Sequence, residues 1–291
     1  MPKMTKLLNR HTHHLAILAV IIFFLKACSS TRIIYTFAED YIKNEIIFFF
    51  DLGEEEEELL NQQVKELVAW HRTSMLPMYS FYLNDIADKL QVGQYGADDI
   101  ERVLENGKSI IEETVIGMTP YASKFLIKNL TDDGIKFMEK RMLKRQQKRI
   151  EELSKLEKIL YEDRLKRLTT NFERFLGNLN VAQVMLLEVY TRETLGDSRT
   201  RLHNRTLRQK AFVKYLRTHP NENELIEFMN KLLLQGHEIT NPSYKAFSIV
   251  WLERFRDLIV EILAISSISQ RDKIISKLRD YAEDFQIVSE N

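Results

Sequence analysis

Residues 54–90 read EEEEELLNQQVKELVAWHRTSMLPMYSFYLNDIADKL, and this stretch decides the fold class. One set of side chains in it recurs at steps of three and four, the spacing of one face of an α-helix: Leu60, Val64, Leu67, His71, Met75, Met78, Tyr82 and Ile86. The five glutamates at its start suit a helix N-terminus, where the macrodipole favours negative charge. The stretch therefore predicts a long helix that Pro77 kinks, because proline supplies no backbone N–H.

The composition of the whole chain favours the same class. The 291 residues include only 9 Gly and 5 Pro, while 44% are hydrophobic and 29% are charged. A chain so poor in turn-forming residues suits long helices, and we predict an all-α multi-helix bundle of about eight to ten helices. The single cysteine, Cys28, excludes an intrachain disulfide and a cysteine-based zinc site.

Helix starts recur along the chain as an oxygen-bearing cap residue followed three residues later by Gln or Glu. These pairs are Asp98 with Glu101, Asn180 with Gln183, Asn221 with Glu224, and Ser267 with Gln270. Further starts are expected at Thr119-Pro120, Thr131 and Asn241-Pro242. Residues 33–50 are apolar enough for a strand pair or a buried helix, and their length and context favour the helix.

Residues 139–167 are more than half charged, with a thin line of apolar side chains running through them. This composition predicts a long solvated helix or helical hairpin that projects from the bundle or spans it. A coiled coil is the weaker alternative, because the apolar line keeps no strict heptad. No linker rich in Pro, Gly or Ser divides the chain, so we expect one helical domain after the N-terminal leader.

The N-terminus has the pattern of an export signal. Lys3, Lys6 and Arg10 precede an apolar run at residues 15–25, which is too short to span a membrane, and small residues follow it. A buried first helix and a signal anchor are the alternatives. We therefore expect residues 1–27 to be a signal peptide and 28–291 an all-α periplasmic domain. The histidines of the leader would be discarded with it.

Leu25-Lys26-Ala27-Cys28 resembles the lipobox of bacterial lipoproteins, although Lys26 is an unusual choice. The resemblance implies cleavage before Cys28 and acylation of its sulfur and its new amine. Two or three acyl chains would hold the protein firmly in a membrane. By the same resemblance, Ser29 is the residue that directs such proteins to the outer membrane, with the periplasmic face of the inner membrane as the alternative location. Apart from this lipid, no cofactor or metal is expected.

Trp70-His71-Arg72, followed by Leu76-Pro77 and Tyr79, is the most distinctive cluster of the chain. The first interpretation is a buried histidine that bonds across the bundle, with Arg72 or Tyr79 pairing a carboxylate such as Glu39 or Asp40. A catalytic or ligand-binding role is the alternative. GxSxG, HExxH and a phosphate-binding glycine loop are all missing from the sequence, so we do not expect an enzyme.

A second basic feature lies between residues 192 and 217, where eight Arg and Lys side chains gather. Cleavage after residue 27 would leave 38 basic against 42 acidic residues, and this acidic balance in an exported chain argues against nucleic-acid binding. Two interpretations stay open for these cations. They pair with nearby carboxylates, or they bind anionic lipid headgroups or lipopolysaccharide phosphates.

Several of these motifs together resemble the DUF6279 family of proteobacterial lipoproteins. The likeness rests on Cys28-Ser29-Ser30 with Arg32 and Tyr35, on Asp40-Tyr41 and Asp51-Leu52, on the Trp70 to Tyr79 cluster, and on Trp251 with residues 267–271 and 281–284. Met75 and the glutamate run depart from that pattern. The resemblance implies a location and a fold but no reaction, because the biochemical function of that family is unknown.

We expect a non-enzymatic interaction or scaffold module, with a periplasmic protein as its partner. The alternative is a binder of lipid or another hydrophobic molecule in an aromatic groove built from Phe37, Tyr41, Phe48, Trp70 and Tyr79. A peptidoglycan hydrolase is the third class. It would require two convergent carboxylates or a metal site.

Overall fold

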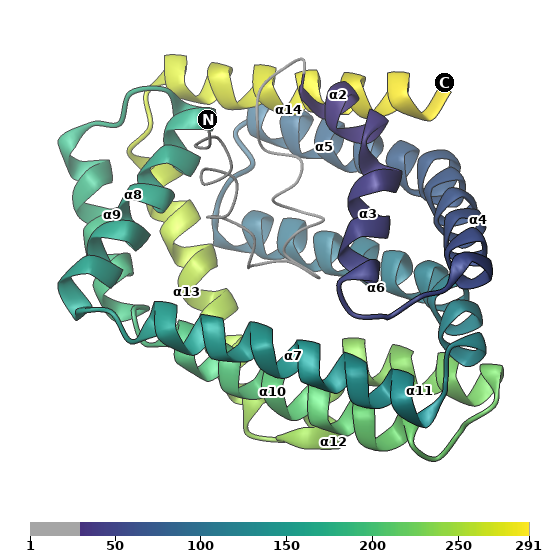
Figure 1. The fold of residues 1–291 in the computed structure, drawn as a ribbon. Helices are drawn as coiled ribbons and strands as arrows, with labels where there is room; N and C mark the ends of the chain where they lie inside the picture. The colour runs from purple at the N-terminus through teal and green to yellow at the C-terminus, as the bar shows by residue number, and fades with distance from the viewer. Residues whose placement is uncertain (1–29, 291) are drawn as a thin grey trace, which may run out of the picture.

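The computed structural model describes residues 30–290, in which all regular structure is helical (Figure 1). The expected lipid attachment site Cys28 and sorting residue Ser29 lie outside the described residues. In chain order the helices are α2 (Ser30–Thr36), α3 (Ala38–Ile47), α4 (Glu54–Trp70), the π-helical segment η1 (His71–Met75), α5 (Leu76–Gln91), α6 (Ala97–Lys128), α7 (Asp132–Leu153), α8 (Glu157–Leu176), α9 (Val181–Glu193), α10 (Asp197–Leu216), α11 (Glu222–Leu234), α12 (Gly236–Thr240), α13 (Tyr244–Ala264) and α14 (Ile268–Glu290). The all-α prediction is confirmed. Residues 33–50 hold the end of α2 and the whole of α3, which Phe37 separates, and residues 48–50 lie beyond α3.

Capping chemistry sets many of the helix starts. The Asn180 side chain accepts a hydrogen bond from the Gln183 N–H at 2.9 Å, and the Gln183 side chain accepts one from the Asn180 N–H at 3.0 Å. Asn221 with Glu224 and Ser267 with Gln270 make the same reciprocal pairs. Each pair satisfies two N–H groups that a helix start leaves without an intrahelical partner. These three predicted starts are confirmed.

Helix α6 differs from its prediction at both expected starts. Its reciprocal cap uses Asp99, whose carboxylate accepts from the Gly96 N–H at 3.0 Å, rather than Asp98 with Glu101. The second expected start, at Thr119-Pro120, is wrong because the helix continues through it. Pro120 offers no N–H to the Ile116 carbonyl, and the buried Thr119 hydroxyl lies 3.0 Å from that oxygen and 2.7 Å from Oδ1 of Asn230. The Thr119 side chain thus places a donor beside the carbonyl that proline leaves free.

The predicted long helix of residues 54–90 is divided by the π-helical segment η1. Pro77 withholds the N–H that the Thr73 carbonyl would accept in an α-helix, and the backbone shifts register just before it. The Leu76 N–H bonds to the His71 carbonyl, five residues back, and Pro77 lies in the first turn of α5. The interruption expected at Pro77 therefore takes the form of a π turn.

The π turn also moves the buried face of the helix. Up to Met75 the predicted face is the buried one, with Leu60, Val64 and Met75 at most 2% exposed. After Met75 the buried positions are Leu76, Ser80, Ala87 and Leu90, whereas Met78, Tyr82 and Ile86 are only half-buried. A π turn holds one residue more than an α turn, so every later side chain is rotated relative to the α-helical pattern.

The charged segment forms two helices, α7 and α8, which are separated by residues 154–156. Helix α7 packs against α10, and α8 packs against α9 and α14. The expectation that this segment projects from the bundle is therefore wrong. Buried Ile135 and Met138 hold the first half of α7, and arginine side chains, described below, cover much of the rest.

The helices pack around a closed circuit (Figure 1). Helix α14 lies along α5 and also contacts α8, which brings the end of the chain against both its first and its middle parts. Four apolar clusters form the core, and α6 contributes Ile100, Phe125 and Leu126 to three of them. None of the helices described is long and apolar enough to cross a membrane.

Candidate functional site

The first described helix, α2, is held by side chains from η1 and α14. Tyr35 of α2 is 7% exposed, and its hydroxyl lies 3.0 Å from Nδ1 of His71. The Arg72 guanidinium lies 5.4 Å above the Tyr35 ring. Arg32, also on α2, donates from Nε to Oδ1 of the buried Asp284 on α14 at 2.8 Å. We call Arg32, Tyr35, His71, Arg72 and Asp284 the α2 socket.

Both ring nitrogens of His71 face hydroxyl groups. On the side away from Tyr35, Nε2 lies 3.2 Å from the Tyr79 hydroxyl, which is 2.8 Å from the Thr114 hydroxyl on α6. The ends of this chain of groups reach backbone carbonyls, since Tyr35 donates to Val68 at 3.3 Å and Thr114 to Ile110 at 2.8 Å. Because Tyr35 donates to Val68, a neutral His71 with its proton on Nδ1 can donate to the Tyr35 hydroxyl. With Thr114 donating to Ile110, the Tyr79 hydroxyl can then donate to either Nε2 or the Thr114 oxygen.

Burial makes the centre of the socket electrically neutral. It lowers the pKa of His71 to about 4, because the charged imidazolium would lose its hydration. It also raises the pKa values of Tyr35 and Tyr79. Among the described residues, no carboxylate bonds to the His71 ring. The arrangement can hold a helix firmly, but it lacks the carboxylate that would orient and charge a catalytic histidine.

The cluster uses a different carboxylate from the two that were expected, Glu39 and Asp40. The carboxylate of the socket is Asp284, which comes from the far end of the chain and pairs with Arg32 rather than with Arg72 or Tyr79. Asp40 pairs with Lys43, three residues away on α3. The sequence could not place Asp284 beside α2, because 252 residues separate it from Arg32.

Trp70 anchors the cluster to α6. A Cβ atom on Gly117 would lie 1.9 Å from Cζ2 of Trp70, so only glycine allows the indole to pack this close. The indole also lies beside Tyr121, with ring centroids 6.2 Å apart. Trp70, His71, Arg72 and Tyr79 thus form one packed region between α2 and α6, and Pro77 causes the π turn that carries His71 and Arg72.

The five aromatic side chains of the alternative groove occupy different settings. Phe37 directly precedes α3 and is 59% exposed. Tyr41 lies on α3 and is 38% exposed. The Phe48 ring is covered by two guanidiniums of α7, each centred 4.2 Å from it. Trp70 and Tyr79 pack against α6 as described above. These rings do not converge in the way that a single hydrophobic ligand would require.

A second set of polar side chains lies where α7, α8 and α10 meet. We call it the arginine layer, and its members are Arg145, Arg149, Arg164, Arg167, Arg201, Arg205 and Arg208. Burial and the neighbouring guanidiniums of Arg145, Arg208 and Arg149 lower the pKa of Arg205. Burial, with Arg201 and Arg167 nearby, likewise lowers the pKa of Arg164. The seven cations therefore form one electrostatically connected group.

Some members of the layer have carboxylate partners. Arg145 pairs with Glu45 of α3 at 2.9 Å, and Arg149 pairs with Glu152 at 2.7 Å. Asp197 is shared, because Arg201 and Arg254 approach it at 3.8 and 4.0 Å. Within residues 30–290, Arg205 and Arg208 have neither an ion pair nor a side-chain hydrogen bond.

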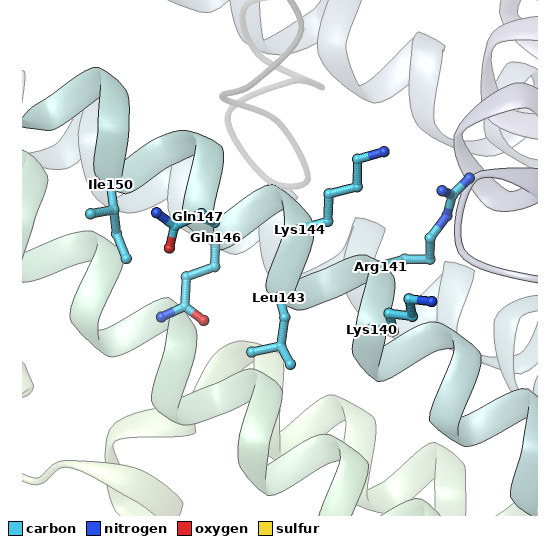
Figure 2. A pocket seen from close by; sticks show the side chains of 7 residues that line it. All are labelled: Lys140, Arg141, Leu143, Lys144, Gln146, Gln147 and Ile150. Carbon is cyan, nitrogen blue, oxygen red and sulfur yellow. The ribbon is translucent and has the colours of Figure 1, made fainter.

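Helix α7 carries a surface depression of about 770 Å³ beside the layer (Figure 2). Lys140, Arg141 and Lys144 line it together with amide and aliphatic side chains, and none of its described lining residues is acidic. In Figure 2, Arg141 and Lys144 point to one side of the helix and Leu143 to the other. A smaller depression, of about 350 Å³, lies between α7 and α10 and is likewise free of acidic lining residues.

The sequence contained a signal for this surface. Between Glu139 and Glu151 no acidic residue occurs, and Lys-Arg pairs repeat every four residues at 140–141, 144–145 and 148–149. On a helix this spacing places three lysines in one row and three arginines in the adjacent row. Averaging the charge over residues 139–167 hides the pattern, because acidic residues are frequent on either side of it. The basic stretch at 192–217 supplies the facing arginines of α10.

Comparison with known proteins identifies one family. No group of three or more side chains that could hold a metal ion occurs among the described residues. No curated protein and no solved structure matches the chain. A family described as "Family of unknown function (DUF6279)" matches residues 48–238, from the end of α3 to α12. The matched range holds the π segment and the whole arginine layer. The motifs expected at residues 28–41, at Trp251 and at residues 267–271 and 281–284 lie outside it. The chain belongs to the DUF6279 family.

Proposed function

We propose that the protein is a lipid-anchored, non-enzymatic interaction module on the periplasmic face of a bacterial outer membrane, acylated at Cys28. The observation that carries this proposal is the position of α2. This helix begins at Ser30, two residues after the cysteine, and the α2 socket holds it to the rest of the bundle. Two residues span at most about 7 Å, so an acyl chain on Cys28 would keep the helical bundle close to the lipid surface.

The chemistry of the socket supports a mechanical role. Its contacts join α2 to η1 and α14, which are remote in sequence but adjacent in the fold. A pull on the N-terminus is therefore resisted by the Arg32 to Asp284 ion pair and by the buried Tyr35 ring. A protein whose anchor is followed by a flexible linker would need no such socket.

The hydrophobic-ligand alternative is less well supported by the geometry. Trp70 is packed against Gly117, Tyr79 is engaged by His71 and Thr114, and Phe48 is covered by arginines. A binder would need these rings to converge on one concave apolar pocket. We therefore retain the interaction module as the proposed function and expect its partner to be a periplasmic protein.

The test compares the wild type with Cys28→Ala for incorporation of radiolabelled palmitate. We expect the wild type to take up label and to sediment with the outer membrane in a density gradient, and the variant to lose the label. The control is the double variant Cys28→Ala with Ser289→Cys, which restores a thiol on α14. It must stay unlabelled if acylation depends on the leader. An unlabelled wild type would refute the anchor, and a labelled protein in the inner-membrane fraction would refute the role of Ser29.

A further inference from the structure

The arginine layer carries more positive charge than its surroundings balance. Its seven guanidiniums are linked as successive neighbours along α7, α8 and α10, and the carboxylates that face them are Glu45, Glu152, Asp163 and Asp197. Two of these four are shared with cations outside the layer, since Asp163 also approaches Lys155 at 3.8 Å and Asp197 also approaches Arg254. At least three positive charges in the layer are thus left without a counter-charge from the described residues.

Arg205 and Arg208 show the imbalance most clearly. Both are half-buried on α10, and neither has a carboxylate partner among the described residues. The Nε atoms of Arg208, Arg145, Arg164 and Arg201 are buried without a hydrogen-bond partner. Buried charges that lack a partner are costly, and a guanidinium cannot escape this cost by losing its proton. An arrangement of this kind is favourable when an anion completes it.

Aromatic rings hold the guanidiniums in place. Arg145 lies 4.2 Å from the Phe48 ring centroid and 4.4 Å from that of Phe49, while Arg201 lies 4.5 Å from that of Trp251. A guanidinium that rests on a ring keeps its N–H donors at its edge, where they remain free to bond. Arg145 and Arg201 are therefore oriented before any ligand arrives, which lowers the entropic cost of binding to them.

The depression on α7 lies next to this layer, although none of the seven arginines lines it. Arg141 lines the depression and shares the Phe48 ring with Arg145, a member of the layer. Exposed Lys140 and Lys144 lie beside Arg141 on the rim. The Phe48 ring therefore joins Arg141 of the depression to Arg145, which in turn is a charged neighbour of Arg205 on α10.

We propose that the α7 depression and the arginine layer form a binding site for a ligand that carries two or more phosphate groups. Guanidinium groups match phosphate oxygens in pairs of parallel hydrogen bonds, and a diphosphate carries about the charge that the layer lacks. The same chemistry is offered by a free condensed phosphate and by a phospholipid headgroup with two phosphates. The site stands on these contacts alone and does not depend on acylation at Cys28.

The first experiment uses inorganic pyrophosphate as the probe on the purified full-length protein in neutral detergent. Pyrophosphate should raise the melting temperature more than sodium sulfate at equal ionic strength. Arg205→Gln should weaken the apparent Kd for pyrophosphate about tenfold or more, because it removes a charge-assisted hydrogen bond. Lys210→Gln is the matched control, since Lys210 is exposed on the same helix and its loss changes the net charge equally. Its Kd should equal that of the wild type.

The stability of the ligand-free variant separates a binding residue from a structural one. The nearest charged neighbours of Arg205 are mainly other arginines, so its removal should leave the melting temperature unchanged or raise it. A lower melting temperature together with an unchanged response to pyrophosphate would show that Arg205 is structural and would overturn the proposal. A wild type that responds equally to pyrophosphate and sulfate would overturn it as well.

The second experiment identifies the source of the phosphate. The protein is sedimented with vesicles of phosphatidylcholine, with or without cardiolipin, whose headgroup contains two phosphates. Greater binding with cardiolipin that is lost in Arg205→Gln and kept in Lys210→Gln assigns the site to a lipid headgroup. A response to pyrophosphate without a cardiolipin effect assigns it to a soluble phosphate compound. Failure of both probes refutes the site and leaves the proposed lipid anchor unaffected.

Discussion

The α2 socket and the arginine layer both take polar groups out of water, but they meet the cost in different ways. In the socket, each nitrogen of His71 has a hydroxyl neighbour, and burial keeps the ring neutral. In the layer, the side chains stay charged and several Nε atoms have no partner. An imidazole can give up its proton, whereas a guanidinium cannot. The groups around His71 can therefore stay neutral, although among the described residues Nε of Arg72 and Oδ2 of Asp284 in the socket also have no hydrogen-bond partner, whereas the layer keeps a net positive charge.

The largest effect is expected at the centre of the socket. His71→Ala would leave a cavity and would deprive the buried hydroxyls of Tyr35 and Tyr79 of their partner. Together these losses should lower the free energy of unfolding by about 3–5 kcal/mol. Urea unfolding followed by circular dichroism measures the change. Tyr79→Phe is the control, because it removes one hydroxyl and keeps the ring, and should cost about 1 kcal/mol. An unchanged stability in His71→Ala would show that the socket holds nothing.

The second effect is a pH dependence that the socket alone should produce. Burial lowers the pKa of His71 to about 4, against an ordinary value of 6.5 in the unfolded chain. Between these values the unfolded state binds a proton that the folded state does not. Stability should therefore fall as the pH drops from 6.5 to 4, by a total on the order of 3 kcal/mol, and His71 should contribute no further loss below pH 4.

Measuring the free energy of unfolding of His71→Gln over the same pH range isolates the contribution of His71. Glutamine keeps hydrogen-bonding capacity but does not titrate, so the variant should lack this part of the acid-induced loss. The difference between the two stability curves is the quantity to measure, since other groups titrate in both proteins. If the stability curves of the wild type and His71→Gln ran parallel between pH 4 and 6.5, His71 would have an ordinary pKa and would be in contact with water.

Local features of the fold could be predicted from the sequence, and the contacts that define the sites could not. Capping pairs such as Asn180 with Gln183 work within one turn, so their residues reveal them. Pro77 and Pro120 each remove the N–H that the carbonyl four residues earlier would accept. The chain forms a π turn before Pro77 and a continuous helix through Pro120, and the outcome depends on which nearby group lies beside that carbonyl. The pairing of Arg32 with Asp284 depends on tertiary packing across 252 residues.

The arginine layer lies between these two cases. The repeated Lys-Arg pairs of α7 and the basic stretch of α10 are visible in the sequence. Their meeting is not visible, because either helix could have turned its cations to solvent and paired them with its own carboxylates. The aromatic residues Phe48 and Phe49, which directly follow α3, decide the outcome, since they give Arg141 and Arg145 a surface to cover.

The smallest expected effect tests whether the arginine row or the lysine row of α7 packs against the end of α3 and the residues after it. Lys144 and Arg145 are neighbours and carry the same charge, but Lys144 is exposed, whereas the Arg145 side chain is 17% exposed and contacts Glu45, Phe48 and Phe49. Arg145→Gln should lower the free energy of unfolding by about 1 kcal/mol, since part of the loss is offset by weaker repulsion from Arg149 and Arg205. Lys144→Gln should change it by less than about 0.5 kcal/mol. Both variants lose one positive charge, so the difference between their free energies of unfolding in urea reports the contacts of the arginine row alone. Equal free energies would mean that α7 does not rest on α3 through its arginines.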